Sequence, residues 1–570
     1  MPGKSHKWVL RSAPSAEAIS RLGGTSGESG GPLGDLPARL LIGRGITDEA
    51  QADAFLNPSY SDLSDPFDMP GMEDAADRVI SAIRSGERIG VIGDFDVDGL
   101  TATALLLGAL KLFGGDAVAY VPDREHDGHG VPRSALSSMH ASGVGLVITA
   151  DTGSSDVEPL QYAVDLGVDV IVTDHHLLGA ELPPAVAIVN PHLGDASSAV
   201  AMLTGAGVAF KLAQAVGRRM ERRGASTAIA LAALGTIADV GPLIDENRII
   251  VTEGLKALEA TDQAGLKSLM RRAKAGGQYG PIDTEAVAFR IGPRLNAPGR
   301  LGHAGISLDL LVCEDPARAD ALAGELEALN NERRRLGKEA ETIADYQIGQ
   351  MEEIPPLISI ASPSLHAGLL GPLAGRLVER FNRPVVAAAY EGETVRASLR
   401  STPGFDIFAA MDSHGDLFDR HGGHARAAGF SAPADNYQAI IDALTEAAAG
   451  SDDIGKPPVL EIDEEVDFGM LGDSLWGFVY RLAPFGEGNP APLFLTRGVM
   501  PEQISAVGAS GDHLRMTLDG GGRKFKAIGF GLGGADLGSG LVDVAYVLRD
   551  NYWAGRKRRE LELKGIRPSV

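Results

Sequence analysis

The sequence predicts an α/β protein with a doubly wound parallel sheet, a long connector helix, a second mixed α/β domain and a small C-terminal β-barrel. Short apolar runs alternate with helical patterns between residues 89 and 238, which is typical of a parallel sheet covered by helices. Residues 315–351 have the pattern of one long charged helix. From Val459 onward, short alternating runs separated by turn residues indicate a barrel.

Length and composition restrict the class of protein. A chain of 570 residues is too long for one core and should hold three or four domains. No stretch approaches 18 uninterrupted apolar residues, and the N-terminus has no apolar core of a signal peptide, so we expect no membrane span and no secretion. The single cysteine, Cys313, excludes intramolecular disulfides and Cys-rich zinc sites. We therefore expect a cytoplasmic protein without a membrane partner.

The net charge of −24 disfavours a non-specific coat on nucleic acid. Local basic patches, and not the total charge, face the phosphates in nucleic-acid enzymes, so the charge does not exclude a nuclease. Each basic cluster in this sequence could equally be a solvated helix or loop face. The clusters are Arg218, Arg219, Arg222 and Arg223; Arg333, Arg334 and Arg335; and Arg556, Lys557, Arg558 and Arg559.

The elements follow in order from a Gly-, Ser- and Pro-rich segment, residues 14–37, which we expect to be a flexible insertion. Helices are expected at 40–56, 74–85, 100–113, 157–166, 207–222 and 229–238, and parallel strands at 89–92, 145–149, 168–173 and 186–189. Residues 357–430 restart as a mixed α/β unit. The barrel strands are expected at 460–466, 503–507, 513–518, 525–530 and 542–548.

Three carboxylates, Asp94, Asp96 and Asp98, follow the first strand of the sheet at alternate positions. Ligands bind at the carboxyl ends of strands in open α/β sheets, and a divalent metal with hard oxygen ligands would compensate the mutual repulsion of these charges. A calcium-binding EF-hand loop is an alternative, but it needs a Glu at the twelfth position, where this chain has Leu105, and a helix upstream. A solvated acidic turn also remains open.

Further acidic and histidine side chains follow other elements of the same sheet. Asp151 comes after the second strand, the Asp174-His175-His176 triplet after the third, and Asp239 after the helix at 229–238. With the first three carboxylates they exceed what one ion needs and suit two Mn²⁺ or Mg²⁺ ions about 3.5–4 Å apart, an arrangement that serves phosphoryl displacement. Adjacent residues of a strand point to opposite sides. We therefore expect His175 to bind metal and His176 to act outside the ligand set or on the phosphate.

Two features lie outside the sheet. Two glycines, Gly422 and Gly423, precede His424, which suggests close approach of the backbone to a ligand, although a structural turn histidine would also fit. In the barrel, Phe525, Tyr552 and Trp553 lie near Arg556–Arg559 and could bind a single strand by stacking and charge, unless the barrel is only a packing module. No GxxxxGK[ST] pattern occurs, so nucleotide-driven motor activity is not expected.

At these residues the chain resembles the DHH phosphoesterase superfamily, and most closely its RecJ family of single-strand-specific 5′→3′ DNA exonucleases. The core motifs are DFDVDGLTA, TDHH, VNPH, GTIADV and RIGPRLNAPGR; GGHARAAGF matches the DHHA1 domain and LAPFGEGNPAPLF the OB-fold domain. The resemblance covers residues 40–568. The domains it implies are an N-terminal extension (1–75), a DHH domain (76–312), a connector helix (313–352), a DHHA1 domain (353–450) and an OB-like barrel (457–570).

The resemblance also implies roles for individual residues. The metal-site residues are Asp94, Asp96, Asp98, Asp151, Asp174, His175 and Asp239, with two Mn²⁺ or Mg²⁺ ions, and the catalytic residues are His176 and His424. Substrate DNA would contact Arg124, Arg294, Asn296, Arg300, Ser398, Arg400 and His424, with Arg124, Ser398 and Arg400 near the 5′ phosphate. Ordinary surface arginines remain an alternative for Arg124 and Arg400.

The implied activity is stepwise release of mononucleotides from single-stranded DNA during DNA repair and recombination, alongside a helicase and a single-strand-binding protein. Two departures from the family pattern, Ser154-Ser155 and His366–Gly371, affect the expected grip on substrate more than the metal chemistry. Two other functions stay open. One is a phosphodiesterase for short oligonucleotides or cyclic dinucleotides, which would not need the barrel. The other is a non-catalytic DNA-binding scaffold, which would not need the carboxylates.

Overall fold

A computed structural model describes residues 6–22, 33–124, 127–194, 199–222, 224, 226–451, 454–508, 511–538, 540–553 and 555–569. Residues 23–32 of the predicted flexible insertion, Arg223 and the side chain of Trp553 lie outside the described part. The chain forms two compact units. The first comprises Leu10–Glu327 and Glu461–Val570, and the second comprises Ala328–Leu460 with the N-terminal residues up to Val9.

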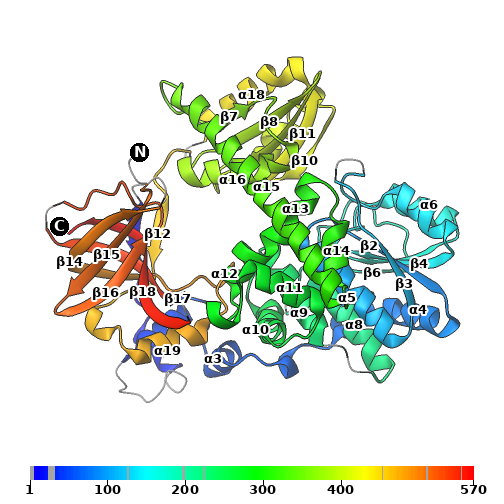
Figure 1. The fold of residues 1–570 in the computed structure, drawn as a ribbon, viewed down its shortest axis with the longest axis horizontal. Coiled ribbons are helices and arrows are strands. Elements are labelled where there is room, and N and C mark those ends of the chain that lie inside the picture. Colours follow the sequence, from blue (N-terminus) through cyan, green and yellow to red (C-terminus); the bar gives the residue numbers. More distant parts are fainter. Residues whose placement is uncertain are drawn as a thin grey trace. The chain divides into compact units, whose positions relative to one another are not determined.

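The first unit contains the predicted parallel sheet. Its strands are β2 (Arg88–Gly93), β3 (Asp116–Tyr120), β4 (Val144–Ala150), β5 (Asp169–Thr173) and β6 (Ala187–Val189). They lie in the order β3-β2-β4-β5-β6, and every neighbouring pair is parallel (Figure 1). The chain passes from β2 to β3 on one side and returns to β4 on the other. The strand order therefore reverses between β2 and β4, the point at which such sheets bind ligands.

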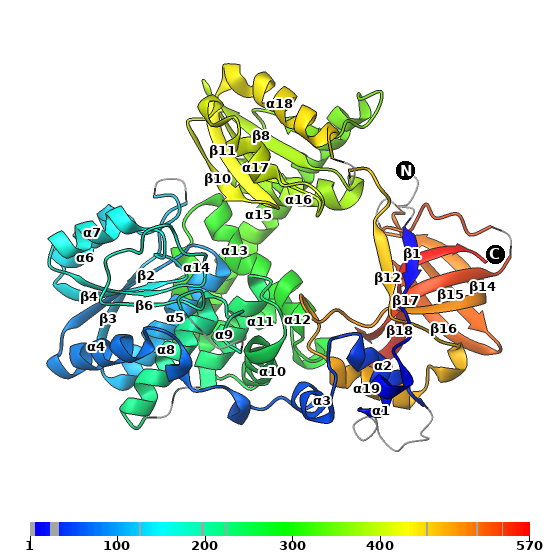
Figure 2. The same cartoon turned by 180° about the vertical axis from the view of Figure 1, so that it is seen from behind.

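Helices cover both faces of this sheet, so the predicted doubly wound architecture is confirmed. α4 (Met72–Ser85), α5 (Val97–Phe113) and α8 (Gly205–Arg219) pack on one face, and α6 (Arg133–Ala141) and α7 (Val157–Asp165) cover the other (Figure 2). The alternation of strand side chains explains the division. Ile148 packs with the first group of helices, whereas its neighbour Val147 packs with the second.

The remaining helices of this unit extend from the sheet. They are α9 (Ser226–Ala238), α10 (Asp245–Glu259), α11 (Ala264–Ala273), α12 (Thr284–Ala286), a π-helical turn η4 (Val287–Ile291), α13 (Gly292–Leu301) and α14 (Gly305–Leu311). The predicted connector is α15 (Pro316–Gly349). The single helix expected at 40–56 is wrong. Two helices, α2 (Leu36–Ile42) and α3 (Glu49–Leu56), are separated by Gly45 in the left-handed region, and Asp48 caps α3.

The second unit is the predicted mixed α/β domain. Its strands are β7 (Ile358–Ala361), β8 (Val385–Glu391), β9 (Thr394–Arg400), β10 (Arg420–His424) and β11 (Ala427–Pro433), in the order β10-β11-β9-β8-β7. Only β7 and β8 pair in parallel. The helices α16 (Leu370–Phe381), α17 (Ile407–Asp412) and α18 (Tyr437–Ala449) complete the domain.

The C-terminal barrel is closed. β14 (Phe494–Val507), β15 (His513–Gly520), β16 (Arg523–Gly529), β18 (Arg556–Pro568) and β17 (Val542–Trp553) follow one another, and β17 pairs back to β14. The sequence prediction shortened β14, because a register shift between Glu502 and Ser505 interrupts its alternation. It missed β18, because that strand begins with the charged run at Arg556. The short strand β13 (Glu464–Glu465) pairs in parallel with the start of β14, and β1 (Lys7–Leu10) pairs with β12 (Val459–Ile462).

The barrel shares its core with the N-terminal helices. Leu36 and Leu40 of α2 and Leu56 of α3 are buried together with Phe478 of α19 (Asp473–Leu482) and Phe494 of β14. Deleting the barrel would therefore expose apolar surface of α2 and α3.

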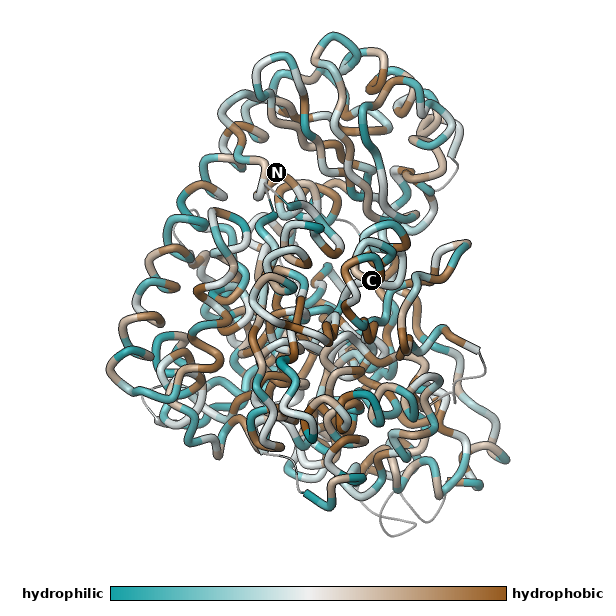
Figure 3. Tube along the Cα trace, turned by 90° about the vertical axis from the view of Figure 1, so that its right-hand side faces the viewer, coloured by the Kyte–Doolittle hydropathy of each residue, from teal (hydrophilic) through white to brown (hydrophobic). Residues whose placement is uncertain are grey.

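Hydrophobic and hydrophilic stretches alternate along the trace in Figure 3, and among the described residues no helix is long and apolar enough to cross a membrane.

Candidate metal centre

Three strands deliver carboxylates to one edge of the sheet. The backbone amides of Asp94, Asp151 and Asp174 donate to Ala150, Thr173 and Val189 on the neighbouring strands, at 3.2, 2.9 and 3.2 Å. Each of these residues thus continues the parallel ladder by one step beyond its strand. The geometry places the first residues after β2, β4 and β5 side by side, at the point where the strand order reverses.

Asp151 has an unusual backbone conformation, with φ +65. A non-glycine residue in this region is uncommon and indicates a local constraint. Glycine keeps the surroundings open, because a Cβ on Gly205 would lie 2.4 Å from Asp151 Oδ1. This oxygen is buried and accepts no hydrogen bond within the described structure, although His175 Nε2 lies 3.1 Å away. A buried carboxylate oxygen that accepts no hydrogen bond needs another partner, and a metal ion bound at this position would provide one.

The three aspartates of the first motif occupy different positions. Asp94 follows the strand, whereas Asp96 caps α5 and its Oδ1 accepts from the amides of Asp98 and Gly99 at 2.9 and 3.1 Å. Asp98 was expected on the loop but lies in the first turn of α5, because this cap starts the helix at Val97.

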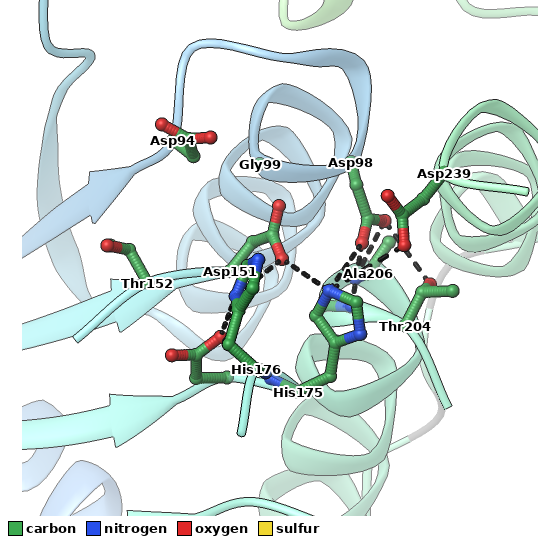
Figure 4. Close-up of polar contacts among 12 residues, drawn as sticks. Asp94, Asp98, Gly99, Asp151, Thr152, His175, His176, Thr204, Ala206 and Asp239 are labelled. Atoms are coloured by element: carbon green, nitrogen blue, oxygen red, sulfur yellow. Dashed lines mark hydrogen bonds and ion pairs between the residues drawn. The ribbon is translucent and has the colours of Figure 1, made fainter. Parts of the chain in front are cut away.

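Asp98 is bound by the N-terminus of α8. Its carboxylate accepts from the amides of Gly205 and Ala206 at 2.7 and 3.0 Å and from Thr204 Oγ1 at 3.2 Å (Figure 4). The first amides of a helix are natural donors to an anion. A Cβ on Gly235 would approach Asp98 Oδ1 to 2.4 Å, so α9 also needs a glycine here. Asp98 therefore joins α5 and α8 at the centre of the cluster.

The two histidines lie on the same side, so their predicted opposite orientation is wrong. Their rings are 4.6 Å apart, because both residues follow the end of β5 and strand alternation no longer applies. His175 Nε2 faces three carboxylates, Asp151 Oδ1 at 3.1 Å, Asp239 Oδ2 at 3.6 Å and Asp98 Oδ2 at 3.9 Å (Figure 4). His176 Nδ1 instead lies 2.7 Å from Asp174 Oδ1.

Asp174 and Asn190 hold His176 in place. Asp174 Oδ2 accepts from the amide of Ser154 at 3.0 Å, and Oδ1 accepts from the amides of His175 and His176. The Asn190 amide group donates to Ser154 Oγ at 2.8 Å and to the carbonyl of His176 at 2.9 Å. Sequence reasoning did not single out Asn190, although its VNPH motif follows a strand. Ser154, one of the two departures from the family pattern, thus belongs to this network.

Three sets of side chains could each hold a metal ion, with ligand atoms within 4.8 Å of one another. They are Asp151, His175 and His176; Asp98, His175 and Asp239; and Asp94, Asp96 and Asp151. Asp174 belongs to none of these sets among the described residues, and its contacts are those of a residue that positions His176.

The electrostatics of the cluster are unfavourable without a cation. Burial, together with the charge of Asp96, raises the pKa of Asp94 to about 7 and that of Asp239 also to about 7. Burial, and then the charges of neighbouring carboxylates, also raise the pKa values of Asp98 and Asp151 well above the ordinary range. Carboxylates that resist ionisation for these reasons fit divalent ions, which compensate the charge.

The histidines have opposite shifts. Burial, and then the charge of His176, lower the pKa of His175 to about 4, which leaves a neutral imidazole able to bind metal. The hydrogen bond with Asp174 raises the pKa of His176 to about 9. Burial acts to raise the pKa of Asp174, but its hydrogen bond with His176 brings that pKa down to about 2. Asp174 and His176 thus form an ion pair beside the cluster.

Of the predicted DNA contacts in this unit, Arg124 is near Asp94 and Asp96, whose charges act on it. Its guanidinium is 5.3 Å from the ring of Phe95, and its pKa is lowered by burial, against the attraction of Asp94 and Asp96. His129, which sequence reasoning missed, lies 3.9 Å from Asp94 Oδ2 and 4.7 Å from the Phe95 ring. No motif marked this histidine.

Arg294 has a structural partner. Its Nε and Nη2 lie 2.5 and 3.0 Å from the carboxylate of Glu327, and Nη1 donates to the carbonyl of Arg290, so the guanidinium joins α13 to α15. Among the described residues, the hydrogen bonds of Arg294 are with Glu327 and Arg290 and not with the aspartates of the metal centre. Asn296 and Arg300 are half-buried on the same helix. This helix approaches the first motif, since a Cβ on Gly299 would lie 3.0 Å from the carbonyl of Phe95.

The remaining predicted residues lie in the second unit. Ser398 and Arg400 are both part of β9, and Arg400 Nη1 lies 3.3 Å from Ser398 Oγ. Arg400 is paired with Ala427, which is paired with His424, so β9, β11 and β10 place Arg400 and His424 on one face of the sheet. A Cβ on Gly371 would lie 3.1 Å from Arg400 Nη2, so glycine leaves this face open.

Known protein families match both units. Residues 88–237 match the model of the DHH family, N-terminal domain, residues 354–450 the DHHA1 domain, and residues 462–565 the RecJ OB domain. The single-stranded-DNA-specific exonuclease RecJ of Escherichia coli is 33% identical over 573 residues, which cover 94% of this chain and 97% of that protein. The chain belongs to the RecJ family.

Other RecJ family members agree. The RecJ exonuclease of Bacillus subtilis is 35% identical over 542 residues, covering 93% of this chain and 67% of that protein. The crystal structure of RecJ from Thermus thermophilus in complex with Mn²⁺ superposes with a TM-score of 0.84 at 32% identity, covering 99% of this chain and 80% of that chain. The same family member has also been crystallised in complex with Mg²⁺. The expected fold, with DHH, DHHA1 and RecJ OB domains, is confirmed.

Proposed function

We propose that this protein is a metal-dependent exonuclease that hydrolyses phosphodiester bonds of single-stranded DNA. The observation that carries the proposal is the buried carboxylate and histidine cluster at the reversal point of the sheet, in a chain that matches RecJ exonucleases over most of its length. The cluster speaks against a non-catalytic scaffold, and the RecJ OB domain speaks against a hydrolase restricted to very short substrates.

Two Mn²⁺ or Mg²⁺ ions are the proposed cofactors. Asp98, His175 and Asp239 would hold one ion, and Asp94, Asp96 and Asp151 the other. The two sets adjoin, since His175 Nε2 lies 3.1 Å from Asp151 Oδ1. When bound, such ions supply an activated water and neutralise charge on the phosphate. The contribution of the chain is to hold hard ligands in a buried, rigid edge, with Asp98 fixed by the N-terminus of α8.

His176 is the proposed hydrogen-bond donor to the phosphate. Its Nδ1 is engaged by Asp174, and its side chain is 59% exposed, so Nε2 can present a proton to a phosphate oxygen outside the carboxylate cluster. The hydrogen bond with Asp174 keeps the imidazole charged at neutral pH, since it raises the pKa to about 9. Asp174 would thereby contribute to hydrolysis indirectly, because it orients His176 and keeps it protonated.

We further infer that digestion proceeds from the 5′ end and releases mononucleotides. Ser398 and Arg400 offer a hydroxyl and a guanidinium on one face of β9, which suits a terminal phosphate. His424 lies on the same face and is proposed to contact the scissile phosphate. Arg124, beside Asp94 in the first unit, is proposed as a separate contact to the DNA.

The barrel is proposed to bind the rest of the strand. Lys557 and Arg559 lie over the rings of Tyr480 and Trp476, at 4.6 and 5.1 Å, so this face of β18 packs on α19. Arg556 and Arg558 alternate with them and are exposed, which leaves two cations for phosphates. The predicted stacking role of Phe525 is limited, because this half-buried ring packs edge-on against Phe468 at 5.2 Å.

DNA repair and recombination in the cytoplasm is the proposed setting, with a helicase and a single-strand-binding protein as proposed partners. The test of the function itself is direct. Purified protein with Mn²⁺ is incubated with 5′-labelled and 3′-labelled single-stranded DNA, duplex DNA and a dinucleotide. We expect single strands to be degraded with early release of a 5′ label as a mononucleotide, and no hydrolysis in EDTA. Cleavage of the dinucleotide alone, or of no substrate, would contradict the proposal.

A further inference from the structure

Val240 adopts a backbone conformation that is strained for its side chain. It follows Asp239 at the C-terminus of α9 with φ +60. Its amide donates to Ile237 at 3.3 Å and the amide of Gly241 donates to Thr236 at 2.9 Å, the two bonds of a Schellman helix end. The left-handed residue of this motif is usually Gly, and a β-branched residue there is an outlier.

Packing within the chain does not explain the valine. Its side chain is 63% exposed, so burial offers little compensation for the strain. Strained residues persist at functional sites, where the conformation or the side chain is needed for binding. The ordinary choice for this turn, glycine, would relieve the strain but would remove the apolar side chain from the position next to Asp239.

A second exposed apolar residue follows the two histidines of the metal centre. Leu177 follows His176 and is 76% exposed, the highest value among the large apolar side chains of the described chain. His175 Nε2 and Asp239 Oδ2 are only 3.6 Å apart, and Figure 4 shows the two side chains facing each other. Leu177 and Val240 follow these groups in the chain by two residues and one residue, and both are exposed, so the backbone places them next to the metal centre. We call this pair the apolar rim.

We propose that the apolar rim contacts the nucleobase of the terminal nucleotide, which the scissile phosphate joins to the rest of the strand. Leu177 and Val240 are then positioning residues for the nucleotide that is released. The inference rests on the proposed function. A scissile phosphate at the metal centre brings the nucleoside on its 3′-oxygen side, the terminal one, close to the same edge, and the nucleobase is the large apolar surface of that nucleoside. Apolar contact with a base face is independent of sequence, which suits an enzyme that degrades any strand.

The experiment compares variants at the strained turn with a matched control. Val240→Gly keeps the turn and removes the rim contact. Glu221→Gly makes the same exchange at the end of α8, where Glu221 has φ +54 and is exposed, and where Arg222 donates to Gly217 as Gly241 does to Thr236. The substrates are two oligonucleotides that differ only in the terminal residue at which digestion starts, thymidine in one and an abasic residue in the other.

We expect Val240→Gly to lower kcat/KM roughly tenfold on the thymidine-ended strand and less than twofold on the abasic one, in line with the free energy of a base contact. Its Tm should stay equal or rise by about 1–3 °C, because glycine relieves the left-handed conformation. Glu221→Gly should show the same Tm behaviour with unchanged kinetics. Leu177→Ala, which leaves the turn intact, should reproduce the kinetic loss.

Equal losses on both substrates, or wild-type kinetics in both rim variants, would overturn the inference. So would a Tm of Val240→Gly clearly below that of Glu221→Gly, because the valine would then stabilise the fold. A wild-type protein that hydrolyses no single-stranded DNA would instead contradict the proposed function, so the two failures are distinguishable.

Discussion

Replacing Asp94 by Asn should stabilise the metal-free protein, and the gain should grow with pH. Asp94 is buried beside Asp96, and the two effects raise its pKa from 3.8 to about 7. Moving a carboxyl pKa by this amount corresponds to about 4 kcal/mol, at about 1.4 kcal/mol for each pH unit. Ionised Asp94 therefore destabilises the folded state without a cation by up to about 4 kcal/mol.

The sign of the pH dependence follows from the direction of the pKa change. Below about pH 4 the carboxyl is protonated in both states and costs nothing. Between pH 4 and 7 the folded state holds the proton more tightly than the unfolded state, so the free energy of unfolding falls as pH rises. Above pH 7 Asp94 is ionised in both states, so the folded state stays destabilised by the full amount, up to about 4 kcal/mol. Asparagine does not titrate, so Asp94→Asn should exceed the wild type by up to about 4 kcal/mol at pH 8.

Urea unfolding followed by tryptophan fluorescence, at pH 5 to 8 in EDTA, measures this difference. Asp74→Asn is the control, because Asp74 is an exposed residue of the first turn of α4 outside the cluster. With Mn²⁺ at about 100 times its Kd, the wild type should gain about 2.7 kcal/mol per site and Asp94→Asn less. Identical pH dependence of wild type and Asp94→Asn in EDTA would refute the electrostatic reasoning.

Three further predictions concern catalysis and binding. Asp239→Ala should reduce hydrolysis by at least a thousandfold without unfolding the chain, whereas near-normal activity with an unchanged Tm would contradict its place in the metal centre. Arg400→Ala should cost about tenfold or more on 5′-phosphorylated strands, in line with about 1.5–3 kcal/mol for a charge-assisted bond, and much less on 5′-hydroxyl strands. Arg396→Ala, an ion-paired position on the same strand β9, is its control, and equal losses on both substrates would exclude a role in end recognition. Replacing both Arg556 and Arg558 by Glu should weaken binding of long strands and leave hydrolysis of a dinucleotide unchanged. The slope of log binding constant against log salt concentration should become smaller by about 0.7 for each phosphate that the barrel no longer neutralises. An unchanged slope would argue against binding of the strand by these two arginines.

The parallel sheet could be predicted because its strands are short, buried on both faces and continuously apolar, and because Asp94, Asp151 and Asp174 each follow such a run. Parallel strands gather their carboxyl ends at one edge, so topology alone predicted that these carboxylates meet. Alternating apolar runs predicted the second and third domains, and the motifs of the RecJ family identified them as DHHA1 and OB domains.

The failures involve contacts between residues distant in sequence or the geometry just beyond a strand. The donation from Gly205 and Ala206 to Asp98 joins positions more than 100 residues apart, and no local pattern marks it. The orientation of His175 and His176 depends on the turn after β5, where strand alternation no longer applies.

The same limit applies to the barrel. Leu36 of α2 is buried in the same core as barrel residues such as Phe494. Neither segment taken alone predicts this packing. This shared core is why point variants, rather than removal of residues 457–570, test the role of the barrel.

The number of Mn²⁺ ions bound per chain tests the central claim most directly. Isothermal titration calorimetry of the metal-free protein, with electron paramagnetic resonance of the loaded protein, counts the ions and reports whether they are neighbours. We predict two ions per wild-type chain with mutual magnetic coupling, because the two ligand sets adjoin where His175 Nε2 lies 3.1 Å from Asp151 Oδ1. Asp239→Ala and Asp94→Asn should each bind fewer ions or bind them at least tenfold more weakly. No binding by the wild type, or two ions bound with unchanged affinity in both variants, would contradict the assignment of this cluster as the metal centre.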